Sequence, residues 1–430
     1  MTGPRIRIAV ATGAFLCAAL AGVVASTSIH MATAACLALV LFLVFAVDRS
    51  GGGAFITSLL LFLACAVSIA QIAEYTELVR ALAIMVLALG AVCGVLDATR
   101  PGNDRLRSAR PLLAVYLVGM VGYFVAATLP FDNTKSLVTG ILGLASLTVY
   151  VLLTTKLLAP HTLDVALVAV LASVIIVSLV LGFVLPDIAV LGGRLRGISA
   201  NPNLLGVYAF LLVAAVVLRR RPWPLTLWAA LLGVATLVWT ASRGSALSLA
   251  IALVVGAVMN AGRARQLALP LLTLGAVSVA LTNYSAEFAG IKLFRANNSR
   301  EAGVQEVLDL VRAGVLGGVG IGNERGQIAS SPLRAFTYGG VVALCCILLI
   351  WLAILWFSWQ SGPATFAFGL GVVVHSNFEG WMVSATGPIV VLFALMWVSM
   401  LLSGPQIGAD RRPSHAAGAV AVTSGSGRTG

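Results

Sequence analysis

The chain has 430 residues, of which 60% are hydrophobic and only 10% are charged. Soluble domains carry about 25% charged residues, so this chain lacks the polar side chains that would cover a soluble core. The formal net charge of +12 does not indicate a nucleic-acid-binding protein, because the basic residues are scattered over loops and not gathered on one face. Composition therefore predicts a membrane protein without a nucleic-acid partner.

Long apolar segments follow one another along most of the chain, and most could cross a bilayer as a helix. They are too continuous for barrel strands, so we expect an all-α polytopic bundle of about 12–14 transmembrane helices over residues 1–402. Residues 403–430 lack apolar periodicity and are expected to form a disordered tail. The segments run near 6–26, 30–47, 54–73, 78–96, 112–129, 136–154, 164–184, 204–218, 224–240, 244–259, 267–282, 333–357, 364–383 and 386–402.

The arginines of the short loops predict the orientation of the chain in the membrane. They precede the first segment, which we interpret as an uncleaved span, and they recur in loops 97–111 and 219–223. Counting spans places these loops on the side of the N-terminus, and the positive-inside rule assigns that side to the cytoplasm. We therefore expect a bacterial cytoplasmic (inner) membrane protein with both termini inside and with loops 185–203 and 283–332 outside.

The first outer loop carries Arg194 and Arg196 shortly before a new apolar segment. Asn201 or Asn203 can cap the helix that begins there, and a helix N-terminus offers free N–H groups to phosphate. Guanidinium groups donate two bonds at once to an anion of this kind. We therefore expect Arg194, Asn201 and Asn203 to bind an anionic substrate. The alternatives are a capped loop with solvated arginines, or arginines paired with lipid headgroups.

The stretch Thr240–Ser245 interrupts a long apolar region at a second outer boundary, and it contains Arg243 and Gly244. An ionisable residue at such a place has a high free-energy cost in the membrane, which makes it a candidate for function. Gly244 permits a tight reversal or a close approach between helices. The alternative is an interfacial arginine that reaches toward the headgroups.

The long outer loop at 283–332 is predicted to contain an amphipathic helix from Asn298 to about Val315. Arg300 lies in its first turn and is a candidate for substrate binding. The glycine-rich run Gly317–Gly322 follows; no strand precedes it, so we interpret it as a flexible turn and not as a dinucleotide site. The apolar stripe, which we expect to lie against the membrane or the spans, consists of Val304, Val307, Leu308, Val311 and Val315.

His375 and Glu379 stand four residues apart near the outer end of the penultimate segment. On a helix this spacing puts both side chains on one face, where they could perform acid/base chemistry. A structural polar pair between helices is the alternative. The chain contains no motif of a metal site or of a serine hydrolase, so we expect neither a metal nor a cofactor.

In their order, these segments resemble the O-antigen ligase and O-antigen polymerase superfamily. The resemblance is strongest over about 190–345 and rests on Arg196–Gly206, Ser242–Leu247 and the run Leu316–Asn323. It implies a GT-C-like membrane fold and metal-independent transfer of a polyprenyl-diphosphate-linked glycan to a glycan or lipid acceptor. By the same resemblance, Arg196 and Arg243 would hold the diphosphate of the donor.

One departure from the family concerns the end of the long loop. Members of the superfamily usually carry a His-Asn pair there, whereas residues 328–334 contain no histidine. Either His375 or Glu379 takes the missing role, or the chemistry differs. A small-solute transporter or a non-catalytic membrane component is therefore the alternative function, and a transporter is expected to show paired broken helices or charges near the bilayer midplane.

Overall fold

The computed structural model describes residues 110–157, 160–199, 201–219, 222–289, 299–324, 328–384 and 387–403. This part of the chain is mostly helical, which agrees with an all-α membrane bundle. The first four predicted spans and nearly all of the predicted tail lie outside the described residues. Five of the described helices are long and apolar enough to cross a membrane, namely α5 (Arg110–Thr128), α6 (Thr134–Leu157), α7 (Pro160–Val184), α10 (Trp223–Thr240) and α14 (Ser331–Ser361).

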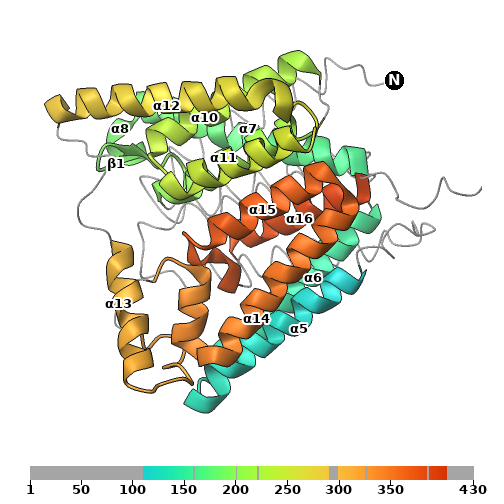
Figure 1. The fold of residues 1–430 in the computed structure, drawn as a ribbon, viewed down its shortest axis with the longest axis vertical. Helices are drawn as coiled ribbons and strands as arrows, with labels where there is room; N and C mark the ends of the chain where they lie inside the picture. The colour runs from blue at the N-terminus through green and yellow to red at the C-terminus, as the bar shows by residue number, and fades with distance from the viewer. Residues whose placement is uncertain are drawn as a thin grey trace, which may run out of the picture.

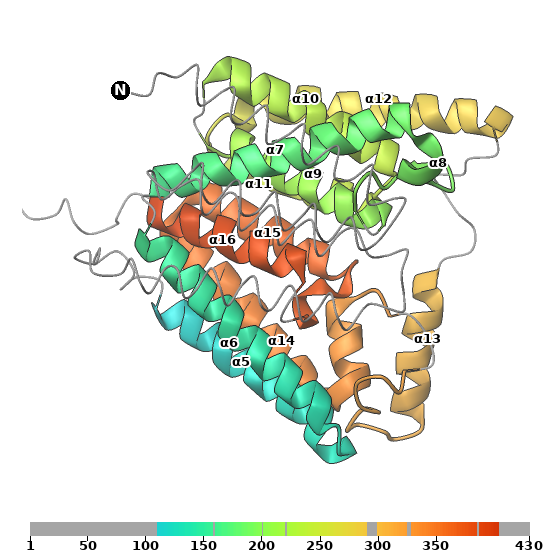
Figure 2. The same ribbon diagram turned by 180° about the vertical axis from the view of Figure 1, so that it is seen from behind.

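Shorter helices complete the bundle (Figures 1 and 2). Four of them are apolar, namely α9 (Pro202–Val217), α11 (Arg243–Val258), α15 (Pro363–Ser376) and α16 (Pro388–Ser403). The remaining elements are α8 (Pro186–Ala189), α12 (Ala264–Ala289), α13 (Ser299–Arg312), the 3-10 helices η3 (Leu129–Phe131) and η4 (Gly380–Val383), and a two-stranded hairpin of β1 (Val190–Leu191) and β2 (Arg194–Leu195).

Helix α9 is the centre of the bundle, and it packs against α7, α10, α11 and α16. Its apolar residues occur on all sides, and nearly all of them are buried, as expected for a helix that neighbours surround completely. Glycine allows the closest of these contacts, because a Cβ on Gly233 of α10 would stand 2.3 Å from Cγ2 of Val213. The body of α9 is therefore closely packed against its neighbours.

The two ends of the bundle carry different polar groups. Figure 1 shows α8, β1 and α13 at one end, which we call the α13 end. At the opposite end Arg219 follows α9 and forms a buried ion pair with Asp164 of α7. Burial lowers the pKa of Arg219 to about 10, so the guanidinium group keeps its proton at neutral pH. Arg194 and Arg219, which the charge pattern assigns to opposite sides of the membrane, thus lie at opposite ends of α9.

Helix α14 is broken near the α13 end. Gly339 and Gly340 leave the helical conformation, and Gly340 has φ 64° and ψ −152°. The glycine-rich run Gly317–Gly322 lies in this break, where Val319 N–H donates to Thr337 O at 2.7 Å and Gly320 N–H donates to Tyr338 O at 2.9 Å. We expected a flexible turn, but the run instead satisfies carbonyl groups that the break in α14 leaves without helical partners.

Helix α13 confirms the amphipathic helix expected in the long loop, although its predicted cap at Asn298 lies outside the described residues. Gly303 faces Ile328, whereas Val304, Leu308 and Val311 are all exposed. Helix α13 itself contacts α14, so it lies against one of the described spans. Which surface covers the exposed part of the apolar stripe, the membrane or another span, stays a prediction.

Candidate functional site

A chain of hydrogen bonds crosses the α13 end from Arg194 to Glu379. Arg194 of β2 donates through Nε to Thr240 O at 2.7 Å, and through one terminal nitrogen to Oδ1 of Asn203 at 2.6 Å. Asn203, in the first turn of α9, donates through Nδ2 to Oε1 of Glu379 at 2.8 Å. Three of the residues that the sequence singled out are therefore brought together from β2, α9 and the turn after α15.

Arg243 lies beside this network as the first residue of α11. Arg194 places a terminal nitrogen 3.5 Å from the carbonyl oxygen of Ala241, two residues before Arg243. The Arg243 side chain is exposed, and no residue in the described part of the chain accepts a hydrogen bond from it. Its donors are available to an anion that reaches this end of the bundle.

Arg196, unlike Arg243, forms hydrogen bonds within its own loop. Its Nε donates to Ile188 O in α8 at 2.8 Å, and its own carbonyl oxygen accepts a hydrogen bond from the Ser199 hydroxyl. These contacts fix the loop between β2 and α9. The structure thus holds Arg196 near the hairpin, and the expectation that Arg196 and Arg243 bind one diphosphate stays a prediction.

The two other candidates from the loops have local roles or lie outside the description. Asn201 caps α9, because its Oδ1 accepts a hydrogen bond from Leu204 N–H at 2.9 Å. This confirms a cap at one of the two predicted asparagines. Arg300 belongs to the first turn of α13, but its side chain lies outside the described residues.

His375 is buried at the end of α15, with only 1% of its surface exposed. Trp381 Nε1–H donates to Nδ1 of His375 at 2.9 Å, and Ser245 Oγ lies 3.0 Å from Nε2. An indole N–H is only a donor, so Nδ1 must accept and the proton of the neutral ring resides on Nε2. His375 therefore donates to Ser245, and these contacts favour a positioning role over direct acid/base chemistry.

The expectation that His375 and Glu379 share one helix face is wrong. Helix α15 ends at Ser376, and Glu379 has an extended backbone with φ −141° and ψ 135°. The side chain of Glu379 consequently reaches Asn203 of α9, whereas His375 reaches Ser245 of α11. The sequence spacing suggested a helical pair, but the turn before η4 separates the two side chains.

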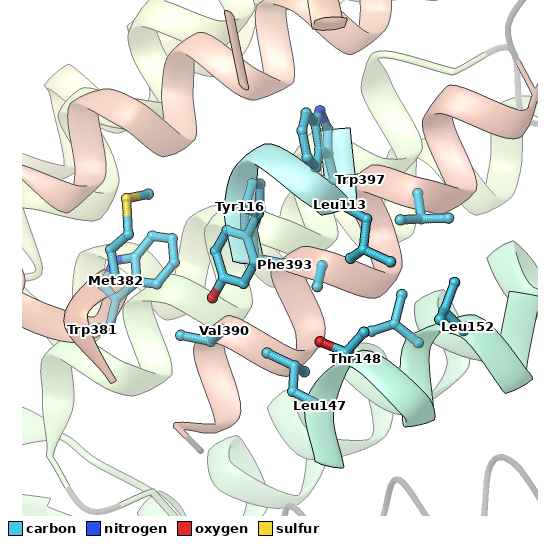
Figure 3. A pocket seen from close by; sticks show the side chains of 13 residues that line it. Leu113, Tyr116, Leu147, Thr148, Leu152, Trp381, Met382, Val390, Phe393 and Trp397 are labelled. Carbon is cyan, nitrogen blue, oxygen red and sulfur yellow. The ribbon is translucent and has the colours of Figure 1, made fainter. Parts of the chain in front are cut away.

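An apolar cavity of about 50 Å³ lies next to this network (Figure 3). Trp381 belongs to its wall, so the residue that holds His375 also borders the cavity. Figure 3 shows the Tyr116 hydroxyl among the lining side chains, and no described residue forms a hydrogen bond with this buried hydroxyl. The remaining lining residues are Leu113, Leu147, Thr148, Val151, Leu152, Met382, Val390, Phe393, Ala394, Trp397 and Val398.

Arg334 is a residue of this end that the sequence did not single out. It lies in the first turn of α14, at the end of the histidine-free stretch 328–334. The Ser331 hydroxyl of the same turn donates to Glu379 O at 2.7 Å, which ties α14 to the segment after α15. Its position in an otherwise histidine-free stretch was the only sequence signal that could have found it.

The described residues contain no group of three or more His, Cys, Asp or Glu side chains that could hold a metal ion. The polar groups at the α13 end are instead arginine, amide, hydroxyl and carboxylate groups. The arginine, amide and hydroxyl groups can donate hydrogen bonds to an anion, and the carboxylate can accept a proton.

No protein-family model matches this chain, and a search of curated proteins finds no match.

Proposed function

We propose that this protein transfers a polyprenyl-diphosphate-linked glycan to a glycan or lipid acceptor at the outer face of the bacterial cytoplasmic membrane, by ligation or polymerisation. The resemblance over about 190–345 supplies the reaction class. The α13 end would then face the outside, as the arginines of the loops predict. The reaction would need neither a metal nor a cofactor.

One observation carries the proposal. The network that joins Arg194, Asn203 and Glu379 combines positive charge with a carboxylate, and the exposed donors of Arg243 lie next to it. Glycosyl transfer from a diphosphate requires both kinds of group. Cations stabilise the negative charge that develops on the leaving diphosphate, and a base accepts the proton of the attacking hydroxyl.

The proposed step is a direct displacement at the anomeric carbon of the donor. The acceptor hydroxyl oxygen forms a bond to this carbon, while the bond from carbon to the diphosphate oxygen breaks. The leaving polyprenyl diphosphate takes the electron pair and is held by Arg243 and Arg196. Glu379 accepts the hydroxyl proton, and Arg194 and Asn203 position its carboxylate. His375 stabilises the first turn of α11 through its hydrogen bond with Ser245.

The alternative function, a transporter, draws support from the break in α14 at Gly339 and Gly340, because discontinuous helices are typical of transporters. Two observations favour the enzyme. The break is occupied by the protein's own glycine-rich run, and the Arg194–Glu379 network lies where helices end.

The experiment is deletion of the gene followed by extraction of lipid-linked glycans and analysis of surface polysaccharide. Transferase function predicts that lipid-linked glycan accumulates and that the surface polymer is lost or shortened. Unchanged levels of both, with loss of uptake or export of a small solute, would instead establish the transporter.

A further inference from the structure

The guanidinium group of Arg334 has no hydrogen-bond or ion-pair partner among the described residues, although part of it is buried. Its Nε is inaccessible to solvent and makes no hydrogen bond to the part of the chain that the structure describes. Within the described ranges, neither a carboxylate nor a carbonyl oxygen accepts from any of its nitrogens. A buried cationic donor without a partner is unfavourable, so this geometry indicates a missing acceptor with negative charge.

The nearby carboxylates are already engaged. Glu324 accepts the Tyr338 hydroxyl at 2.7 Å through Oε1 and Gly322 N–H at 2.9 Å through Oε2. Glu379 accepts from Asn203 through Oε1. Among the described residues, Glu324 forms no ion pair with Arg334, because its two oxygens accept from Tyr338 and Gly322.

Gly380 fixes where the guanidinium group lies. The three atoms nearest to a Cβ built on Gly380 are Cζ, one terminal nitrogen and Nε of Arg334, at 2.8, 2.8 and 3.0 Å. The guanidinium plane therefore packs against the bare backbone at the start of η4, directly after Glu379. Any larger residue at position 380 would push it away.

We propose that Arg334 is a phosphate-binding residue and that its guanidinium group, held over Gly380, receives a phosphate group at the α13 end. A planar guanidinium group matches two phosphate oxygens at once, and the unpartnered Nε is one of the two donors of that fork. The phosphate belongs either to the diphosphate of the donor or to a lipid headgroup. In the first case the inference deepens the proposed function and rests on it.

The test measures thermal unfolding of the full chain in detergent with inorganic pyrophosphate. Wild-type protein is expected to be stabilised as pyrophosphate rises. Arg334→Met should increase the half-saturating concentration roughly 10- to 150-fold, since a charge-assisted hydrogen bond is lost. Arg334→Lys should recover only part of the affinity, because a lysine cannot form the fork.

A second variant moves the guanidinium group of Arg334 without removing its charge. Gly380→Ala displaces the guanidinium group and should also weaken pyrophosphate binding. The matched control is Arg312→Met, which removes an exposed arginine on α13 that pairs with Asp309 and should leave binding unchanged.

A readout without ligand separates binding from a structural role. In phosphate-free buffer, Arg334→Met should unfold at the same temperature as wild type or higher, because the guanidinium group makes no hydrogen bond or ion pair with the described residues that could be lost, and the methionine side chain can still pack over Gly380. A clear decrease would overturn the proposal, and so would pyrophosphate that stabilises wild type and Arg334→Met with the same affinity.

The source of the phosphate is decided by a parallel series with a short-chain phosphatidylglycerol. Stabilisation by this lipid that depends on Arg334, with none by pyrophosphate, would assign a headgroup site. The absence of Arg334-dependent stabilisation in both series would refute the phosphate site. Pyrophosphate binding through Arg334 in a chain that transfers no glycan would uphold this site and refute the proposed function alone.

Discussion

Asn203 Nδ2 donates to Glu379 Oε1 across 2.8 Å, although 176 residues separate the two along the chain. The contact joins the first turn of α9 to the segment after α15. Because Asn203 also accepts from Arg194, this amide orients a guanidinium group and a carboxylate at the same time. It is therefore the point at which the candidate site is most easily disrupted.

Asn203→Ala removes an acceptor from Arg194 and a donor from Glu379. We expect a loss of about 1–3 kcal/mol in the free energy of unfolding, and a larger proportional loss of glycan transfer. Thermal unfolding and transfer are measured on the same preparation. The control is Asn201→Ala, which removes the cap of α9 at a cost of about 1 kcal/mol but leaves Glu379 untouched. Equal transfer by the two variants would contradict a role of Asn203 in orienting Glu379.

Arg243 and Arg194 should respond differently to substitution by alanine. Arg243 is exposed and makes no hydrogen bond to the described residues, so Arg243→Ala should unfold like wild type yet lose transfer roughly 10- to 150-fold. Arg194→Ala should lose both stability and transfer, because its side chain bridges Thr240 and Asn203. Transfer at matched membrane expression checks both. Normal transfer by Arg243→Ala would remove Arg243 from the site.

The His375 ring should be neutral with its proton on Nε2. Solution or solid-state NMR of protein with ¹⁵N-labelled histidine detects this tautomer directly, and His375→Asn identifies the signal. Trp381→Phe removes the donor to Nδ1. The two ¹⁵N chemical shifts of the His375 ring should then move toward the values of a mixture of the two tautomers. A protonated Nδ1 in the wild-type protein would contradict the contact with Trp381 and reopen direct acid/base chemistry at His375.

The break in α14 predicts a sharp contrast between two glycines. A Cβ on Gly340 would stand 1.9 Å from Leu316 O, and its backbone is left-handed, so Gly340→Ala should destabilise the protein by about 1–3 kcal/mol or more. Gly317 has open space around its Cα, so Gly317→Ala is the matched control and should be tolerated. Thermal unfolding of both variants is the measurement. Equal tolerance would mean that the run does not lie in the break.

Apolar length and loop charge were sufficient to predict most of the described helices and the separation of Arg194 from Arg219. These features depend on local composition, because a run of apolar residues needs only neighbouring spans or lipid to be stable. The broken helix was not predictable in this way. Gly339 and Gly340 lie inside a continuous apolar segment, and only the distant run at Gly317–Gly322 reveals why the helix can break there.

The candidate site was predicted in part for a similar reason. Arg194, Asn203 and Glu379 were each recognised as polar residues at predicted boundaries, and the structure brings them together. The mistaken helical pairing of His375 with Glu379 followed from spacing alone, because three residues between α15 and η4 change the direction of the side chains. Arg334 was overlooked, since its significance lies in a partner that it lacks.

The activity proposed for the α13 end is transfer of a glycan from a polyprenyl diphosphate. Purified protein in liposomes, supplied with a radiolabelled polyprenyl-diphosphate oligosaccharide, a candidate acceptor and EDTA, tests it most directly. We predict that labelled glycan moves to the acceptor, that polyprenyl diphosphate is released in equal amount, and that Arg243→Ala and Glu379→Gln reduce both products while Arg312→Met does not. Retention of all label on the donor, under conditions where cells containing the protein elongate or ligate that same glycan, would contradict the account.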